Sequence, residues 1–255
     1  MLNVKRFTFV YFTLLYVLFR LTSLHFLFFL IAALVYIGIM VYGSFHIGSN
    51  FYMKPICSLK TNEKKVAITF DDGPEENNTH QILAVLEKFG IKAAFFCIGE
   101  QVSKNPDLVR TIDAMNHIVG NHSYSHSKWF DFYSKKKMKE ELQRTEQVIE
   151  QTIGKKTKLF RPPFGVTNPA LAKTVKDMNY IPVGWSIRSL DTRSSKRYRR
   201  IINRIVRKLK PGSIILLHDK HPDIALILEN TLEYIMKSGY EIVRLDHLIN
   251  QKAYA

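Results

Sequence analysis

The run Thr69-Phe70-Asp71-Asp72-Gly73-Pro74 constrains this chain more than any other segment. It ends the apolar stretch Val66–Phe70, which has the composition of a buried strand, and Gly73-Pro74 closes that strand with a turn. Two adjacent carboxylates repel each other, so both stay ionised only beside a bound metal or a buried arginine. Barrels and open α/β sheets collect their active sites at the carboxyl ends of their strands. The run therefore predicts a cation-dependent site at the end of a strand.

Two histidines follow a second apolar segment, Ile118-Val119-Gly120, in the run His122-Ser123-Tyr124-Ser125-His126. Neutral imidazole is the commonest metal ligand in proteins. Two histidines and one carboxylate are also the ligand set of hydrolytic zinc sites that keep a position open for water. The pair alone is a weak signal, because exposed histidines at this spacing arise by chance. It predicts a metal site only together with the aspartates.

Two more motifs follow, Arg161-Pro162-Pro163-Phe164-Gly165 and the apolar segment Ser213–Asp219, which carries His218 near its end. Taken alone, His218 reads as a polar residue that ends a strand. In this order the segments resemble the polysaccharide deacetylase family, carbohydrate esterase family four. Its pattern runs TFDDGP, HSxxH, RPPxG, a segment with tryptophan and aspartate, and LLHD. The resemblance extends from about Lys65 to Leu248.

The resemblance implies a metal site formed by Asp72, His122 and His126. Zinc is the metal we expect there, because it lowers the pKa of bound water to about 7. The same ligands also accept Co²⁺ or Ni²⁺, so the residues alone do not decide which metal is bound.

The resemblance also implies the proton-transfer groups. Asp71 is expected to be the general base, held ionised by Arg161. His218 is expected to be the general acid that protonates the leaving amine, and Asp191 to orient it. The backbone N–H of Phe164 is expected to help stabilise the oxyanion of the tetrahedral intermediate.

One segment departs from the family pattern. The family often has Asp-x-x-Asp-Trp, whereas this chain has Arg188-Ser189-Leu190-Asp191-Thr192. The second aspartate is present, but the first acid and the tryptophan are not. Trp185 precedes this segment, and we interpret it as a core residue of a strand. The wall of the substrate groove is therefore not predicted from the sequence.

The rest of the chain alternates apolar and amphipathic segments, which predicts an α/β fold with a mostly parallel sheet and crossover helices. Besides those above, the expected strands are 92–98, 182–187 and 241–245, and the expected helices are 81–89, 106–115, 137–153, 169–178, 198–209 and 223–238. The resemblance implies a distorted (β/α) barrel of about seven strands. We expect residues 65–250 to form the catalytic domain and residues 51–64 a linker.

Residues 1–50 are expected to form a membrane anchor. The segment 24–45 is apolar and long enough to span a bilayer. A second apolar run, 7–19, is short for a span, and we expect either an interfacial segment or the first arm of a hairpin. No cleavage site of the secretory type is apparent, which favours an anchor over a removed signal.

The side of the membrane depends on how many segments cross. If only 24–45 crosses, Lys5, Arg6 and Arg20 stay in the cytoplasm and the domain faces outward. If both runs cross, the N-terminus and the domain share one side, and the same charges, together with Lys54, Lys60, Lys64 and Lys65, favour the cytoplasm. We favour the extracytoplasmic side, where acetylated polymers occur.

The formal net charge is +15, and its densest contribution is the basic segment 193–210, with Arg193, Lys196, Arg197, Arg199, Arg200, Arg204, Arg207, Lys208 and Lys210. A solvated helix face and an anion-binding patch explain it equally well. Nucleic acid is not an expected partner, because no reading motif is present. The sequence does not decide whether Cys57 and Cys97 pair, nor the oligomeric state.

We therefore expect a membrane-anchored, metal-dependent hydrolase that removes N-acetyl groups from an N-acetylhexosamine glycan, such as peptidoglycan or a chitin-like oligomer. Two alternatives remain. One is a deacylase or deformylase of a lipid-linked aminosugar, and the other is a catalytically silent glycan-binding module. A pure binding module has no need for both Asp71 and His218, which argues against the last alternative.

Overall fold

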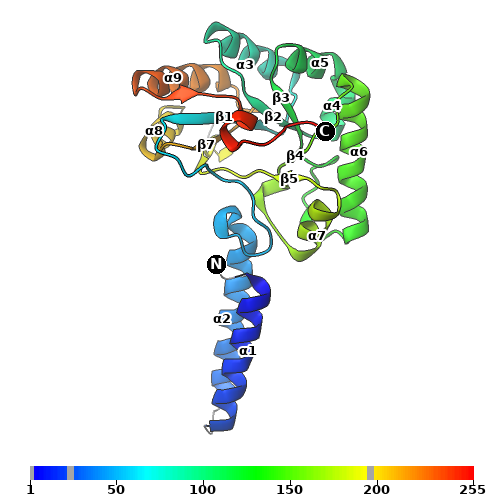
Figure 1. Cartoon of the computed structure of the whole chain (residues 1–255), viewed down its shortest axis with the longest axis vertical. Helices are drawn as coiled ribbons and strands as arrows, with labels where there is room; N and C mark the ends of the chain where they lie inside the picture. Colours follow the sequence, from blue (N-terminus) through cyan, green and yellow to red (C-terminus); the bar gives the residue numbers. More distant parts are fainter. Residues whose placement is uncertain (1–2, 22–25, 194–197) are drawn as a thin grey trace.

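The computed structural model describes residues 3–21, 26–193 and 198–255. A rounded α/β domain carries a helical hairpin that projects from one side (Figure 1). The strands are β1 Lys65–Asp71, β2 Ala94–Cys97, β3 Ile118–Asn121, β4 Leu159–Phe160, β5 Ile181–Pro182, β6 Ile187–Arg188, β7 Ile214–His218 and β8 Glu241–Ile242. They pair in the order β5-β4-β3-β2-β1-β7-β6, and β8 pairs with the start of β1. Every pair is parallel.

The main sheet curls into a half-barrel, as the α/β barrel prediction requires, and β5 and β6 are its two ends. The prediction of one continuous strand over 182–187 is wrong. This segment changes its partner strand instead. Up to Val183 it is hydrogen-bonded to β4, because the N–H of Val183 donates to the carbonyl of Phe160. From Ser186 it is hydrogen-bonded to β7, because the N–H of Ser186 donates to the carbonyl of Ile214. The predicted strand 241–245 is also too long, because Leu245 already begins a helix.

Helices cover the outside of the sheet. They are α3 Glu76–Lys88, α4 Gly99–Lys104, α5 Pro106–Ala114, α6 Lys135–Ile153, α7 Pro169–Asp177, α8 Tyr198–Lys208, α9 Ile224–Lys237 and α10 Leu245–Ile249. All six predicted helices are confirmed. In α6, the Ser134 hydroxyl accepts a hydrogen bond from the N–H of Lys137, and Gly154 ends the helix at φ 68°. Met138 and Leu142 lie on its buried face, so α6 follows the amphipathic pattern of its sequence.

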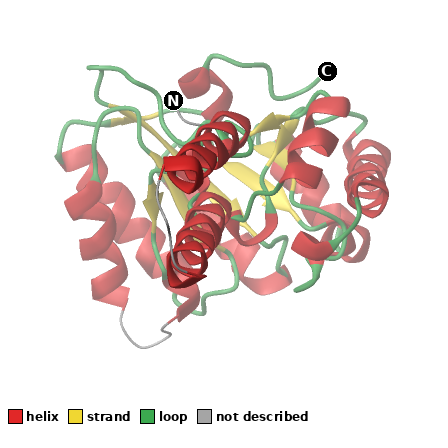
Figure 2. Ribbon diagram, turned by 90° about the horizontal axis from the view of Figure 1, so that it is seen from below, coloured by secondary structure: helices red, strands yellow, loops and turns green. Residues whose placement is uncertain are grey.

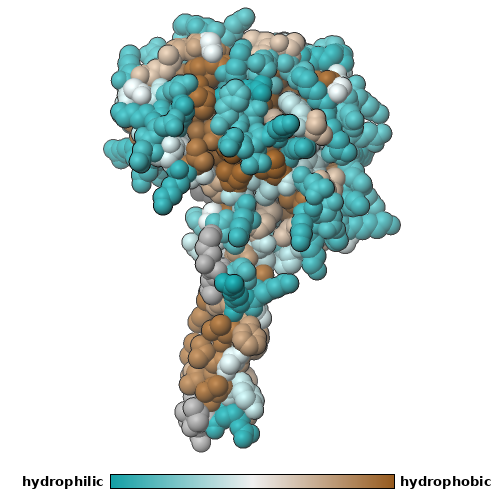
Figure 3. Space-filling model, viewed as in Figure 1, coloured by the Kyte–Doolittle hydropathy of each residue, from teal (hydrophilic) through white to brown (hydrophobic). Residues whose placement is uncertain are grey.

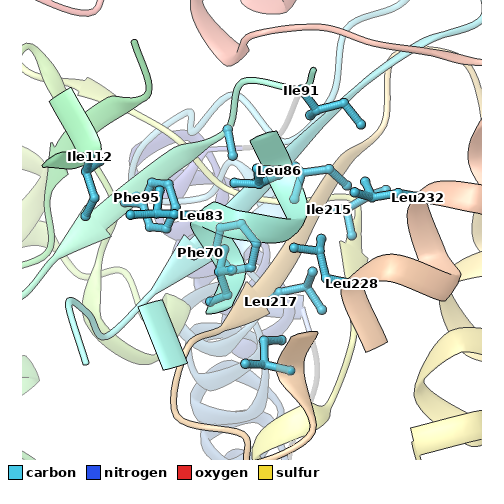
Figure 4. Packing of buried hydrophobic residues seen from close by; sticks show 14 of the residues in the cluster. Phe70, Leu83, Leu86, Ile91, Phe95, Ile112, Ile215, Leu217, Leu228 and Leu232 are labelled. Carbon is cyan, nitrogen blue, oxygen red and sulfur yellow. The ribbon is translucent and has the colours of Figure 1, made fainter. Parts of the chain in front are cut away.

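Alternate residues of β1 face opposite sides of the sheet. Val66, Ile68 and Phe70 belong to the large apolar cluster between the sheet and helices that include α3 and α9. Figure 4 shows Phe70 beside Phe95, and their stacked ring centroids lie 5.0 Å apart. Thr69 consequently lies on the inner face of the half-barrel.

The N-terminal hairpin consists of α1 Val4–Leu21 and α2 Phe26–Phe45. The two helices lie side by side, as the view along the hairpin in Figure 2 shows, and the rings of Phe7 and Tyr36 stack with centroids 5.7 Å apart. Among the described residues, α2 alone is long and apolar enough to cross a membrane. Figure 3 shows apolar side chains concentrated on the hairpin, while hydrophilic residues cover much of the visible face of the domain.

The hairpin and the chain that follows it contact the domain directly. The Ser44 hydroxyl donates to the carbonyl of Thr167 at 2.7 Å, and the N–H of Thr167 donates to the carbonyl of Ser44 at 3.0 Å. Further along, Ile56 pairs with Val183, and Ser58 pairs with Ser213. Residues 56–58 thus lie across the opening between β5 and β7.

One open point of the sequence, the pairing of the two cysteines, is answered by the fold. Cys57 and Cys97 are free thiols and do not pair. In α8, Ile201 and Ile205 are buried against the domain, while Arg199, Arg200 and Arg207 are exposed. Lys196 and Arg197 of the basic segment lie outside the described residues.

Candidate active site

The carboxyl ends of neighbouring strands bring the sequence motifs together. Asp71 of β1 lies level with His218 of β7 in the parallel register. Cys97 of β2 pairs with Asn121 of β3, and Asn121 pairs with Phe160 of β4. His122 and Arg161 therefore follow the ends of β3 and β4 at the same level. Motifs that are far apart in the chain meet at one edge of the sheet, as the strand-end argument predicts.

Asp72, His122 and His126 form a cluster whose ligand atoms all lie within 4.8 Å of one another. Asp72 Oδ1 lies 3.5 Å from His122 Nε2 and 3.4 Å from His126 Nε2. Ligands about 2.0 to 2.2 Å from a tetrahedral ion lie about 3.3 to 3.6 Å from one another. The donors therefore have the chemistry and the spacing that a small divalent metal requires.

The imidazoles are prepared to bind a metal. His122 Nδ1 lies 2.8 Å from the carbonyl of Arg161, and a proton on Nδ1 leaves the lone pair of Nε2 directed at the cluster. Burial, together with the neighbouring His122, lowers the pKa of His126 to about 4, so this ring is neutral at pH 7. Burial opposes ionisation of Asp72, but His122, His126 and Lys220 hold the pKa of Asp72 below its usual value. Its carboxylate is therefore charged at neutral pH.

The ligands lie on strained backbone, and hydrogen bonds support the loop that carries the histidines. Asp72 and His126 have positive φ values of 77° and 46°, a conformation that is rare outside glycine and is concentrated at functional sites. The loop between the histidines is fixed by Glu141 of α6, whose carboxylate accepts hydrogen bonds from the N–H groups of Tyr124 and Ser125. A residue remote in sequence thus sets the position of His126.

Asp71 and Arg161 form a buried ion pair. Arg161 Nη1 donates to Asp71 Oδ1 at 2.7 Å and to the Thr69 hydroxyl at 2.8 Å. Its Nη2 and Nε donate to the carbonyls of Gly184 and Val183. Arg161 is fully buried, and its guanidinium also lies over the ring of Phe96. Desolvation lowers the pKa of Arg161, but the adjacent Asp71 counteracts that effect. Asp71 therefore has a fixed cationic partner.

His218 and Asp191 form the second buried pair. His218 Nδ1 lies 2.7 Å from Asp191 Oδ1, so its Nε2 is the ring nitrogen that remains for the cavity. Burial disfavours the imidazolium, but the hydrogen bond and charge of Asp191 outweigh it and raise the pKa of His218. The Ser189 hydroxyl donates to Asp191 at 2.8 Å. The pair has the geometry by which a carboxylate orients an imidazole.

A cavity of about 200 Å³ joins both pairs and the metal cluster, and its lining comprises Asp71, Asp72, His122, His126, Phe164, Gly165, Trp185, Arg188, Thr192, Leu216 and His218. The ring of Phe164 is 46 % exposed and contacts His126 edge-on, with centroids 4.5 Å apart. The interpretation of Trp185 as a core residue is wrong. It is half-buried and lines the cavity beside Gly165, where a Cβ would lie only 2.4 Å from the indole ring.

Four residues shape this site in ways that the sequence did not predict. Thr69 bonds Arg161, Asp219 supports the loop after Asp72, and Trp185 and Arg188 line the cavity. The position of Thr69 could have been predicted. It lies two residues before Asp71 in the same strand, so the two side chains face the same side of the sheet. The positions of Asp219, Trp185 and Arg188 depend on which strands are neighbours in the sheet, and the sequence does not show that order.

Asp219 is buried against the turn that carries Asp72. Its Oδ2 accepts hydrogen bonds from the Thr79 hydroxyl at 2.8 Å and from the N–H of Glu75 at 3.2 Å. Gly73 is required here, because a Cβ at that position would lie 1.8 Å from Asp219 Oδ2. Burial raises the pKa of Asp219 to about 7, and the nearby charge of Asp72 contributes in the same direction.

Comparison with known proteins agrees with this geometry. The family model described as Polysaccharide deacetylase matches residues 58–183. A peptidoglycan-N-acetylglucosamine deacetylase of Bacillus cereus is 36 % identical over 196 residues, which cover 75 % of this chain and 91 % of the relative. The peptidoglycan-N-acetylmuramic acid deacetylase PdaA of Bacillus subtilis is 31 % identical over 197 residues, covering 75 % of this chain and 74 % of PdaA.

Solved structures show the same fold. The crystal structure of the Bc1960 peptidoglycan N-acetylglucosamine deacetylase, in complex with a hydroxamate-type ligand named as an N-oxidanyl-benzamide, superposes with a TM-score of 0.74 at 28 % identity. The match covers 78 % of this chain and 94 % of that structure. The fold and site are those of a metal-dependent hydrolase with a candidate Asp-His-His ligand set. This chain belongs to the polysaccharide deacetylase family, carbohydrate esterase family four.

Proposed function

We propose that this protein is a metal-dependent hydrolase that removes N-acetyl groups from an N-acetylhexosamine glycan, with peptidoglycan or a chitin-like oligomer as the substrate class. One observation carries the proposal. Asp71 and His218 lie level with each other on adjacent strands, and both line the cavity that holds the Asp72–His122–His126 cluster. A base and an acid beside a metal site are what amide hydrolysis requires.

Each side chain then has a distinct role. Asp71, paired with Arg161, removes a proton from the attacking water, and His218, oriented by Asp191, delivers a proton to the leaving amine. The backbone N–H of Phe164 donates to the oxyanion. A divalent metal, zinc by preference for two imidazoles and a carboxylate, supplies an activated water and polarises the acyl oxygen when bound.

The relatives support the glycan class. Curated proteins that match most of this chain bear the names peptidoglycan-N-acetylglucosamine deacetylase and peptidoglycan-N-acetylmuramic acid deacetylase. Both sugars carry the acetamide that the site is suited to cleave. Peptidoglycan is therefore the first substrate to test.

The α1–α2 hairpin is proposed to anchor the catalytic domain, residues 65–250, to a membrane, with residues 51–64 connecting the two. The apolar α2 supports this anchoring. We place the domain on the extracytoplasmic side, where peptidoglycan lies. The charge rule favours the opposite side if both helices cross, so sidedness needs its own measurement.

The test uses the full chain in detergent, loaded with Zn²⁺, and measures acetate released from N-acetylglucosamine oligomers and from purified peptidoglycan. We expect release that stops in chelator and is lost in the Asp71→Asn variant, which still binds metal. Release at the wild-type rate by Asp71→Asn would contradict the assignment of the base. No release from either substrate by the metal-loaded protein would contradict the proposal as a whole.

A lipid-linked aminosugar is the second candidate substrate, and one contact favours it. Ser44, at the end of α2, bonds Thr167, which follows the loop that contains Phe164. The cavity rim is thus tied to the end of the apolar hairpin. If this candidate is correct, a lipid-linked hexosamine is deacylated and the water-soluble oligomers are not.

A further inference from the structure

Arg188 lies in the catalytic cavity without a partner for its charge. It is the last residue of β6 and pairs with Leu216 of β7, two positions before His218. Both Arg188 and Leu216 line the cavity. Arg188 Nε is buried and has no hydrogen-bond partner. No described carboxylate forms an ion pair with Arg188. All Asp and Glu residues of the chain lie in the described ranges, so none is left as a partner.

The guanidinium of Arg188 lies near an aromatic ring, and a hydrogen bond holds its backbone. Its Cζ lies 5.7 Å from the centroid of the Trp185 ring, and Arg161 Cζ lies at the same distance from that ring. The carbonyl of Arg188 accepts a hydrogen bond from Arg204 Nε at 2.8 Å. Trp185 itself is confined by Gly165. A guanidinium near an aromatic ring and without a hydrogen-bond partner for its Nε is available to bind a ligand.

The other charged groups of the cavity do not need Arg188. Asp71 is paired with Arg161, Asp191 with His218, and Asp72 belongs to the metal cluster. Arg188 therefore adds a positive charge that the proposed hydrolysis leaves unused. Buried polar groups without a partner in the free protein are often satisfied by a ligand.

We propose that Arg188 binds a carboxylate carried by the sugar whose N-acetyl group is removed. This inference rests on the proposed function and specifies its substrate. A planar guanidinium matches the two oxygens of a carboxylate with two parallel hydrogen bonds. One guanidinium also balances one negative charge, whereas a phosphate monoester carries up to about two at neutral pH.

The chemistry of the glycan identifies such a sugar. In N-acetylmuramic acid, the lactyl carboxylate is attached through the oxygen on the carbon next to the one that bears the acetamide. Its carboxylate is thus a few bonds from the scissile amide, close enough to enter the same 200 Å³ cavity. N-acetylglucosamine has no charge there. Arg188 is therefore expected to favour muramyl residues whose lactyl carboxylate is free.

The experiment compares two matched substrates and needs no variant for its first result. Glycan strands with free lactyl carboxylates are compared with the same strands after chemical conversion of those carboxylates to amides, and N-acetylglucosamine oligomers serve as the neutral reference. We measure kcat and KM for acetate release by the metal-loaded full chain in detergent. The free-carboxylate strands are expected to have kcat/KM about 10- to 100-fold above the amidated strands, the range of a charge-assisted hydrogen bond.

Variants then assign that preference to Arg188. Arg188→Gln is expected to abolish the preference, mainly through KM, and Arg188→Lys to retain part of it, because lysine keeps the charge but not the planar fork. Arg200→Gln is the matched control, since it removes the same charge from the exposed face of α8. It is expected to keep the preference, which excludes general attraction between a basic protein and an acidic polymer.

The outcomes separate this inference from the proposed function. Equal kcat/KM on free and amidated strands, or an unchanged preference in Arg188→Gln, overturns the role of Arg188 and leaves the deacetylase intact. No acetate from any of the three substrates overturns both. A preference that Arg200→Gln also removes would assign it to bulk charge and would overturn the assignment to Arg188.

Discussion

His218 and Asp191 are joined by two hydrogen bonds. The ring Nδ1 of His218 lies 2.7 Å from Asp191 Oδ1, and the backbone N–H of His218 donates to Asp191 Oδ2 at 2.7 Å. Both residues are buried. One carboxylate thus fixes the backbone and the ring of the same histidine, so the ring has little freedom to turn away from the cavity.

This relationship predicts a pH effect. The folded protein raises the pKa of His218, so the ring stays protonated to higher pH than a free histidine, as a general acid requires. Asp191→Asn removes the negative charge and lowers that pKa. We expect the alkaline limb of the kcat/KM profile to move to lower pH, with activity at pH 8 reduced by about 100-fold or more.

The profile is measured with N-acetylglucosamine oligomers at saturating Zn²⁺. Asp177→Asn is the control, because Asp177 is exposed at the end of α7 and pairs with Lys135. It should retain the wild-type profile. An Asp191→Asn enzyme that is slower by the same factor at every pH would mean that Asp191 only positions the ring.

A second prediction concerns the buried pair of Arg161 and Asp71. Arg161→Met leaves the Asp71 carboxylate buried without its cation, and it leaves two backbone carbonyls without donors. Removing one partner of a buried ion pair costs about 3 to 5 kcal/mol. We expect thermal unfolding about 10 °C or more below wild type. Asp71→Asn also leaves a buried charge uncompensated, that of Arg161, but it keeps an acceptor for Nη1 and leaves the bonds to the Gly184 and Val183 carbonyls in place. It should therefore lower the midpoint by less than Arg161→Met does; equal losses would contradict this account.

The third prediction concerns the metal. Chelator should abolish acetate release, and added Zn²⁺ should restore it, because Asp72, His122 and His126 supply three ligands and leave a position for water. His126→Ala should lose most of the bound metal in elemental analysis. His80→Ala is its control, since His80 is exposed on α3. Full metal content in His126→Ala would mean that the ion binds elsewhere.

The fourth prediction follows from Asp219. Burial raises the pKa of Asp219 to about 7, above its value in the unfolded chain. Between the unfolded value of about 4 and the folded value of about 7, the folded state holds more protons. Stability should therefore fall as the pH rises through that window.

Asp219→Asn mimics the protonated carboxyl group, so it should remove this part of the pH dependence. We expect the metal-free variant to unfold at a higher temperature than wild type at pH 8, and the difference to shrink at pH 5. The carbonyl oxygen of asparagine still accepts the bonds from Thr79 and Glu75. A variant that is less stable than wild type at pH 8 would show that the charged carboxylate supports the turn.

The sequence was sufficient for the parts of the site that lie within one segment. The apolar stretch before Asp71 predicted a strand, and the turn after it placed two carboxylates at the strand end. The six amphipathic segments became helices because their apolar stripes match the helical period. The resemblance to the family contributed the roles of residues whose partners are far away in the chain.

The rest depended on which strands are neighbours. The segment 182–187 looked like one strand, yet β5 and β6 lie at opposite ends of the sheet, and this separation directs Trp185 into the cavity. The support that Glu141 gives to the histidine loop depends on α6 packing beside that loop. No local pattern reports such contacts, because they arise from tertiary packing.

The last prediction concerns the hairpin and the side of the membrane on which the domain lies. The N–H of Val4 donates to the carbonyl of Phe51 at 3.2 Å, so the start of α1 lies beside the chain that leaves α2. If both helices cross together, the N-terminus and the catalytic domain are on one side and Arg20 is near the other. We expect protease added to intact spheroplasts to remove both an N-terminal epitope and the domain, because the proposed substrate is outside. Digestion of the domain with a protected epitope would mean that α2 crosses alone, and protection of both until detergent is added would place the active site in the cytoplasm.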